Sequence, residues 1–132
     1  MKPYEINETA MGYLKANWSA TQIRDILKKN KPEPPFIEPH FLPGGVTALE
    51  VDGAAERNGV LKINIFTKLG AGTKEGEVYG GMLEDLFHHY SIGHLLFENG
   101  DIMPWTEWVG VDKSLQAGHH QTTIPFSVIW EN

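Results

Sequence analysis

The sequence predicts an α+β domain, in which a mostly antiparallel sheet has an N-terminal helix and a central helix packed on one face. Two patterns predict this class. Apolar and polar residues alternate in residues 60–67 and 123–130, as in strands with one buried face, whereas apolar residues recur every three or four positions in residues 3–17 and 75–90, as in amphipathic helices. The order helix, strands, helix, strands then gives a single α+β domain over residues 1–132.

The composition is that of an ordinary globular domain, and it excludes several classes of function. A chain of 132 residues with 41% hydrophobic and 21% charged residues is long enough for one real core. The net charge of -6 and the pI near 5.4 give no electrostatic case for wrapping nucleic acid or adhering to an anionic membrane. The absence of cysteine excludes disulfides, thiolate metal sites and thiol catalysis. No apolar run approaches the ~20 residues of a membrane span, and no signal peptide pattern occurs, so we expect a chain that is neither embedded nor secreted.

The first element is predicted to be a helix over residues 3–17. Pro3 suits a first helical position, and apolar residues recur every four positions on one face. That face is formed by Ile6, Ala10, Leu14 and Trp18. Residues 19–31 are compatible with a helical turn, but residues 21–23 are equally compatible with a short extended piece, so both interpretations stay open.

The next elements are predicted to be strands separated by a turn. Residues 36–42 are expected to be extended, with Pro39 at a sheet edge or a bulge because proline has no N–H to donate. Pro43-Gly44-Gly45 is typical of a turn, and residues 46–52 form a further strand candidate. We expect this segment to pair antiparallel with the strand at residues 60–67, which places Leu61, Ile63 and Ile65 on one face and Lys62 and Asn64 on the other.

The central helix is predicted to lie with one face on the sheet. Its apolar side is formed by Val78, Tyr79, Met82, Leu83, Leu86, Phe87 and Tyr90, and its polar side by Glu77, Glu84, Asp85 and His88. Gly80 and Gly81 are expected away from the centre of the apolar face. Each costs about 1 kcal/mol against alanine in a helix interior, so either they are tolerated on a solvated face or a neighbouring subunit approaches closely there.

The C-terminal third is predicted to be a hairpin, a loop and a strand. Asn99-Gly100 lies between apolar runs at residues 94–97 and 101–109, and this is the strongest short-range hairpin signal that a sequence offers. Residues 112–120 show no period and are expected to be a loop. The closing strand places Ile124, Phe126, Val128 and Trp130 on one face, and its Pro125 again indicates an edge or a bulge.

Three patterns were weighed as chemical sites, and each has a simpler interpretation. Five histidines lie in two groups, but their spacing does not match the i, i+4 pair of helical zinc sites: His88, His89, His94, His119 and His120. The turn Gly70-Ala71-Gly72-Thr73 precedes a helix as phosphate-binding loops do, yet it lacks the Walker lysine. Trp105 and Trp108 have opposite parity in one strand, so core packing explains one of them but not both, and contact with a protein partner is one of two open interpretations of the other.

Several of these segments together resemble the small tail terminator family of long-tailed bacteriophages. The resemblance is carried by residues 36–43, by residues 59–66, by the glycine-rich joint at residues 68–73, by Leu83-Glu84-Asp85-Leu86-Phe87, and by residues 123–130. It covers most of residues 36–132 and, more loosely, the first helix. It implies a structural protein of the virion, located in the tail or neck and assembled in the host cytoplasm, with no catalytic residue, metal or cofactor.

What the resemblance implies about partners is equally specific. The chain is expected to form a homohexameric ring on the head-proximal end of the tail tube, to stop polymerisation of the tube protein, and to present a docking surface to the head connector. DNA would pass through the lumen without specific binding, and no membrane is involved. We predict that subunit or partner contacts fall on Arg57, Lys68, Leu69, Gly70, Gly72, Gly80, Gly81, Trp105 and Trp108.

Three alternatives remain open from the sequence. A head-to-tail joining or head-completion protein of the neck has the same fold, and fold does not settle role. A small metal-dependent hydrolase would use some of the histidines. A cytoplasmic adaptor would use Trp105 or Trp108 as its anchor.

Overall fold

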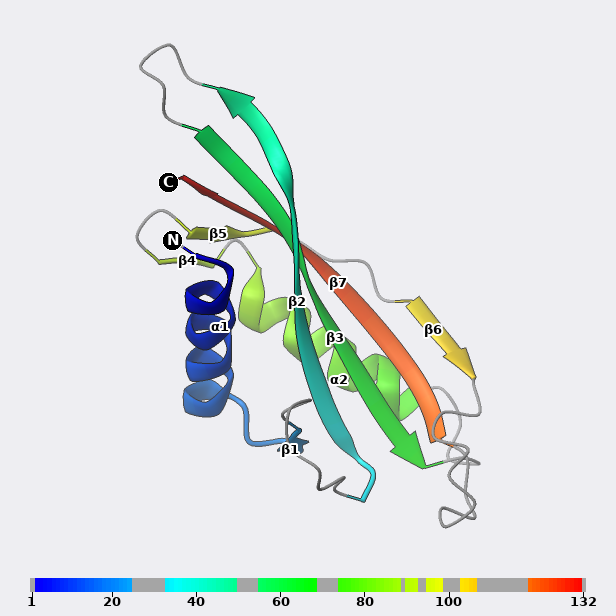
Figure 1. Cartoon of the computed structure of the whole chain (residues 1–132). Coiled ribbons are helices and arrows are strands. Elements are labelled where there is room, and N and C mark those ends of the chain that lie inside the picture. Colours follow the sequence, from blue (N-terminus) through cyan, green and yellow to red (C-terminus); the bar gives the residue numbers. More distant parts are fainter. Residues whose placement is uncertain are drawn as a thin grey trace.

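Two helices lie on one face of a single sheet in a computed structural model of the chain (Figure 1), which confirms the predicted α+β class. The structure describes residues 2–24, 33–49, 55–68, 74–88, 90–92, 95–98, 103–106 and 119–131. The elements in this part of the chain are α1 (Pro3–Asn17), β1 (Gln22–Ile23), β2 (Phe36–Leu49), β3 (Ala55–Lys68), α2 (Lys74–Phe87), β4 (Ser91–Ile92), β5 (Leu95–Phe97), β6 (Met103–Thr106) and β7 (His119–Glu131).

Seven strands form the sheet within the described ranges, in the order β1-β2-β3-β7-β5-β4, with β6 also paired to β7. Every pair is antiparallel except β1 with β2, so the sheet is mixed although mostly antiparallel. The short extended piece that was one of two interpretations of residues 19–31 is present as β1. The indole Nε1 of Trp18 donates a hydrogen bond to Thr21 Oγ1 at 2.9 Å and so fixes the chain between α1 and β1.

The core lies between the helices and the sheet, and the predicted alternation of strand residues builds it. Leu61, Ile63 and Ile65 of β3 are fully buried, and the apolar residues of the closing strand face the same layer. Phe87 of α2 lies at its centre, with its ring centroid 5.1 Å from that of Phe97 and 5.2 Å from that of Phe126. Burying an aromatic or aliphatic side chain of this size stabilises the fold by roughly 1.5–3 kcal/mol, so this layer supplies most of the driving force.

Helix α1 begins and ends where the sequence predicts, and its predicted apolar face is buried. It contacts α2 through Tyr13, whose hydroxyl donates a hydrogen bond to the Leu86 carbonyl at 2.7 Å and whose ring stacks on Tyr90 with centroids 3.9 Å apart. Burial raises the pKa of Tyr13, and the neighbouring Tyr90 adds to this. The neutral phenol is therefore part of the folded state.

Helix α2 is rotated about its axis relative to the prediction. Its buried residues are Gly76, Gly80, Leu83 and Phe87, whereas Val78 and Met82 are 51% and 43% exposed. The expectation that Gly80 lies away from the buried face is therefore wrong, as is the expectation that Val78 and Met82 face the sheet. The helix packs on β3 and β7, and two of the four residues on its buried side are glycines, which have no side chain to keep neighbouring groups at a distance.

Each proline in the strands lies where its missing N–H costs no ladder bond. Arg24 donates its backbone N–H to the Ile37 carbonyl, so odd-numbered residues at this end of β2 direct their backbone groups away from β3. Pro39 and Pro43 share this parity, and Pro39 therefore lies on an edge as predicted. Pro104 of β6 is opposite Thr122, whose backbone groups point toward β3, so the Pro104 nitrogen points away from β7.

Pro125 obeys the rule in a different place. Strand β7 is not an edge, because β3 pairs with one side of it and β5 and β6 pair with the other. The β6 pairing reaches Thr123, and the β5 pairing begins at Val128. Pro125 directs its nitrogen into the interval between those two strands, so the predicted edge or bulge is wrong and a gap between two short strands takes its place.

Two predicted connections are also wrong. Pro43-Gly44-Gly45 does not turn the chain, because β2 continues through it to Leu49 with register shifts against β3. A Cβ on Gly44 would lie 2.9 Å from the Asn58 carbonyl oxygen, so the glycine serves a close strand approach at a bulge. Strands β5 and β6 do not form the predicted Asn-Gly hairpin with each other, since both pair with β7, and β4 is the hairpin partner of β5.

Two boundaries differ as well. Strand β7 begins at His119, within the segment predicted to be a loop, and β3 begins at Ala55 rather than near residue 60. The antiparallel pairing of β2 with β3 is confirmed. None of the helices in the described part of the chain is long and apolar enough to cross a membrane.

Two alanine substitutions for glycine should have opposite effects on the free energy of unfolding. A Cβ on Gly59 would lie 2.8 Å from both the Leu42 carbonyl oxygen and the Phe41 ring, so Gly59→Ala should destabilise the fold by about 1–3 kcal/mol. A Cβ on Gly12 of α1 would meet no atom within 4 Å, so Gly12→Ala should stabilise it by up to about 1 kcal/mol. Urea unfolding measures both, and effects of the same sign would contradict the packing described.

Stability should fall at alkaline pH through the partly buried Tyr13. The pKa of Tyr13 is higher in the folded state than in the unfolded chain, so the unfolded chain loses its phenolic proton first, and stability is lost as pH rises above about 10. Tyr13→Phe should cost about 0.5–1.5 kcal/mol at neutral pH through the lost hydrogen bond, while its stability should decline less steeply above pH 10. Parallel pH-dependent slopes for the two proteins would show that Tyr13 is not the responsible group.

Candidate functional site

The face of the sheet opposite the helices holds a buried polar trio formed by Asn64, Gln121 and Thr123. Gln121 donates its amide Nε2–H to Asn64 Oδ1 at 3.1 Å, and it lies 3.2 Å from Thr123 Oγ1. Thr123 in turn donates to Asn64 Oδ1 at 2.9 Å. These three side chains join β3 to β7, and each satisfies another, as buried polar groups must. Their hydrogen bonds link β3 to β7, and this is a structural role rather than a reactive one.

A charged cluster lies beside the trio on the same face. Glu38 is opposite Asn64 in the ladder and is buried. Arg24 Nη1 pairs with its Oε2, and His40 Nε2 lies 2.7 Å from its Oε1. Removing Arg24 would leave a largely buried carboxylate with one partner fewer, which destabilises the fold. The cluster therefore fixes β1 against β2.

An open groove of about 440 Å³ crosses this face farther along the strands. Its apolar residues are Leu42 of β2, Val60 of β3 and Ile129 of β7, and Leu42 is 52% exposed. Its polar lining includes Asn58, Ser127 and Glu98, and the Glu98 backbone N–H bonds to the Ser127 carbonyl at 2.8 Å. We call this the root groove, because beyond it β2 and β3 extend past both helices as a projecting arm (Figure 1).

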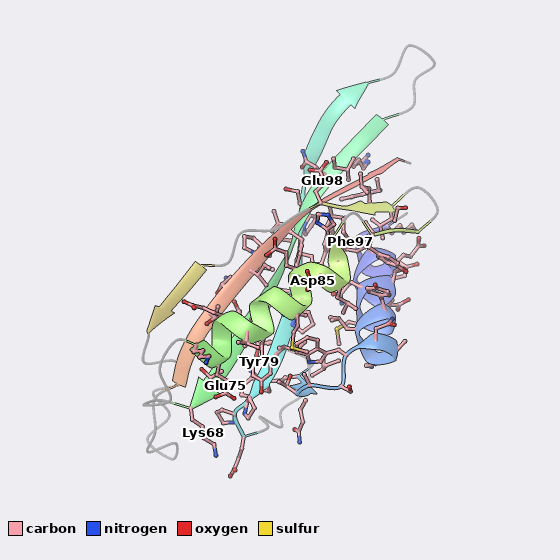
Figure 2. The ribbon with its side chains drawn as sticks, turned by 180° about the vertical axis from the view of Figure 1, so that it is seen from behind. Lys68, Glu75, Tyr79, Asp85, Phe97 and Glu98 are labelled. Atoms are coloured by element: carbon pink, nitrogen blue, oxygen red, sulfur yellow. The ribbon has the colours of Figure 1, made fainter. Side chains whose placement is uncertain are left out.

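The helix face of the domain carries a second exposed apolar feature. Val78 and Met82 lie one turn apart on the side of α2 that is turned away from the core. A Cβ on the adjacent Gly81 would meet no atom within 4 Å. Figure 2 looks onto α2 from this side, with Asp85 on the helix. We call Val78, Gly81 and Met82 the outer stripe of α2.

The structure does not gather the predicted interface residues into one site. Arg57 and Lys68 both lie in β3, but Lys68 follows Arg57 by eleven positions, so the two are roughly 36 Å apart along the strand. Lys68 is exposed at the end of β3, and Arg57 pairs with Val46 and Trp130 at the base of the arm. Gly81 belongs to the outer stripe, whereas Gly80 is on the buried side of α2. Trp105 pairs with Gln121, and Leu69, Gly70, Gly72 and Trp108 lie outside the described residues.

The histidines are distributed along the chain in the same way. His88 is exposed just after α2, while His119 and His120 pair with Lys68 and Thr67 at the start of β7. His89 and His94 fall outside the described ranges. Among the residues that the structure describes, no three histidine, aspartate or glutamate side chains lie close enough to hold a metal ion.

The root groove was not found from the sequence, although a signal for it exists. Leu42, Val60 and Ile129 occupy the parity of their strands that holds polar residues at the neighbouring positions His40, Lys62 and Ser127. Leu42 pairs with Val60, and Ile129 lies one rung farther along β7, opposite Asn58, so the three side chains are neighbours on one face. This proximity becomes visible once the register is known.

Comparisons with known proteins identify the fold and no family. No family model matches the chain, and no curated protein matches it. One similar solved structure, whose name states no function, has 18% sequence identity and a TM-score of 0.66 over 98% of this chain and 96% of its own. At this identity the likeness extends to the fold, and it covers nearly all of both chains.

The polar trio should respond non-additively to substitution. Thr123→Val leaves Asn64 and Gln121 each short of one partner in a buried place and should cost about 1–3 kcal/mol. Replacing all three at once, as Asn64→Leu, Gln121→Met and Thr123→Val, leaves no unpaired donor, so the triple variant should lose less than the sum of the single losses. Ser127→Ala on the same face is the control and should stay within about 0.5 kcal/mol of the parent in urea unfolding. A triple-variant loss equal to the sum of the single losses would contradict this hydrogen-bonded link between β3 and β7.

Proposed function

We propose that this protein is a bacteriophage tail terminator, which forms a ring on the head-proximal end of the tail tube, ends tube polymerisation and offers a docking surface to the head connector. Its role is mechanical, and its partners are its own copies, the tube protein and the connector. DNA passes through the ring lumen without a specific contact.

The observation that carries this proposal is the way in which the resembling segments meet. Residues 36–43 lie in β2, residues 59–66 in β3 and residues 123–130 in β7, and these three strands are consecutive neighbours in the sheet. Residues 83–87 form the last turn of α2, which packs on β3 and β7, whereas residues 69–73 of the glycine-rich joint lie outside the described residues. The described part of the resemblance thus falls on one contiguous structural unit.

The surfaces of the domain also support a ring subunit. A closed ring requires two different surfaces on each subunit that fit each other under a rotation. The root groove and the outer stripe are two exposed apolar features on opposite faces of the sheet. The arm extends past the helices, and a neighbouring subunit is a natural support for it (Figure 1).

A head-completion protein of the neck is the second candidate, since the same small fold is expected in both roles. The protein that each binds separates them. A terminator binds purified tails that lack heads, whereas a head-completion protein binds filled heads that lack tails.

The decisive experiment is electron microscopy of tails assembled without this protein and then with it. Tubes should overrun their normal length without the protein, and its addition should give tubes of uniform length capped by a ring of about six subunits. Tails that reach normal length and are capped without it, combined with filled heads that leak or fail to join, would replace the terminator role with the head-side role.

A further inference from the structure

The outer stripe of α2 is apolar without an intramolecular reason. The buried side of the helix is complete with Gly76, Gly80, Leu83 and Phe87, so Val78 and Met82 contribute nothing to the core. Two large apolar side chains one turn apart, directed away from the sheet, expose apolar surface to water at about 25 cal/mol per Å². Contact with another chain would remove this apolar surface from water.

The root groove is a complementary surface on the opposite face. It is concave and open, and its volume of about 440 Å³ accommodates several side chains. Its floor is apolar at Leu42, Val60 and Ile129. A convex apolar pair on one face and a concave apolar groove on the other are the two halves of a head-to-tail contact.

We infer that Val78 and Met82 of one copy insert into the root groove of the next copy. The inference rests on the proposed function, since a ring requires a repeated contact between unlike surfaces, and it names the residues that make this contact. Gly81 lies between the two knobs and adds no side chain, so the helix backbone reaches the rim of the groove.

Charge at the two surfaces fits one orientation of the helix. Helix α2 bears Glu75, Glu77, Glu84 and Asp85 against one lysine, Lys74. Lys74 and Asp85 lie on the outward side of α2 at opposite ends of the stripe, and both are exposed. At the groove, Glu98 lines the side next to β7. Lys62 lies on the same face as Val60, two residues farther along β3. Seating the helix with Lys74 near Glu98 places Asp85 near Lys62, which joins opposite charges at both ends.

The edges of the sheet favour this contact over strand addition. Pro39 and Pro43 remove two of the N–H groups that the outer edge of β2 would offer between residues 38 and 43, leaving that of Phe41. An added strand would find few partners along this edge. The association of copies is thus directed to side chains at the stripe and the groove.

Disulfide trapping tests the contact with little background, because the chain has no cysteine. Two single variants, Leu42→Cys and Met82→Cys, are mixed and oxidised mildly, and each is also oxidised separately. Tyr4→Cys is the matched control, since Tyr4 is an exposed apolar residue of α1 at 59% exposure and lies outside the proposed contact. The mixture of Leu42→Cys with Met82→Cys should yield at least tenfold more crosslinked dimer than the mixture of Leu42→Cys with Tyr4→Cys.

The other outcomes are equally informative. The double variant with both cysteines in one chain should give a ladder of crosslinked species that ends at about six subunits. Dimers of Met82→Cys alone in equal yield would mean that the stripe pairs with itself, and this would overturn the inference. No crosslink at the highest soluble concentration would overturn it as well.

The same variants separate this inference from the proposed function. Capped tubes of normal length whose rings do not crosslink between positions 42 and 82 would retain the terminator role and discard this contact. Crosslinked closed rings that leave tube length unchanged would retain the contact and discard the role.

Discussion

The packing of α2 on the sheet is the constraint on which the rest of the structure depends. Gly76, Gly80, Leu83 and Phe87 form the buried side of the helix, and Leu83 and Phe87 belong to the core between α2 and the strands that it contacts, β3 and β7. The aromatic cluster around Phe87 joins both helices to the strands, because Tyr13 of α1 contacts it edge-on with ring centroids 5.2 Å apart.

The same packing of α2 determines which of its side chains are exposed to solvent. With the glycines facing inward, the apolar residues Val78 and Met82 necessarily face outward. Core packing and the exposed stripe are therefore one consequence of a single rotation of the helix. The protein gains a hydrophobic contact surface without a separate structural element to carry it.

The sheet is organised by the direction of its hydrogen bonds. Strands β2, β3 and β7 are long, and β3 pairs with β2 on one side and with β7 on the other, whereas the remaining strands are short. Prolines occupy positions whose nitrogens point away from any partner strand, which keeps the ladder intact and leaves fewer N–H groups on the outer edge of β2. On the face away from the helices, the hydrogen-bonded Asn64, Gln121 and Thr123 and the paired Glu38 lie beside the stacked rings of Phe36 and Phe66. The root groove lies farther along the same face.

The sequence by itself determined the α+β class, the limits of α1, and the buried faces of β3 and β7, because each of these follows from a local period that one layer of burial reinforces. Tertiary structure decided the rest. A helical period restricts the buried side of α2 to a broad arc, but packing on β3 and β7 decided which residues of that arc are buried, and it placed Gly76 and Gly80 inward and Val78 and Met82 outward. The Asn-Gly signal at residues 99–100 predicted a local hairpin, but a long partner, β7, offered β5 and β6 more pairing than they offered each other. Pro43-Gly44-Gly45 predicted a turn, yet the same flexibility serves a bulge when β3 continues alongside. The root groove depends on which residues of three strands are neighbours on one face, and this is fixed by register, a property of strand pairs that no single segment contains.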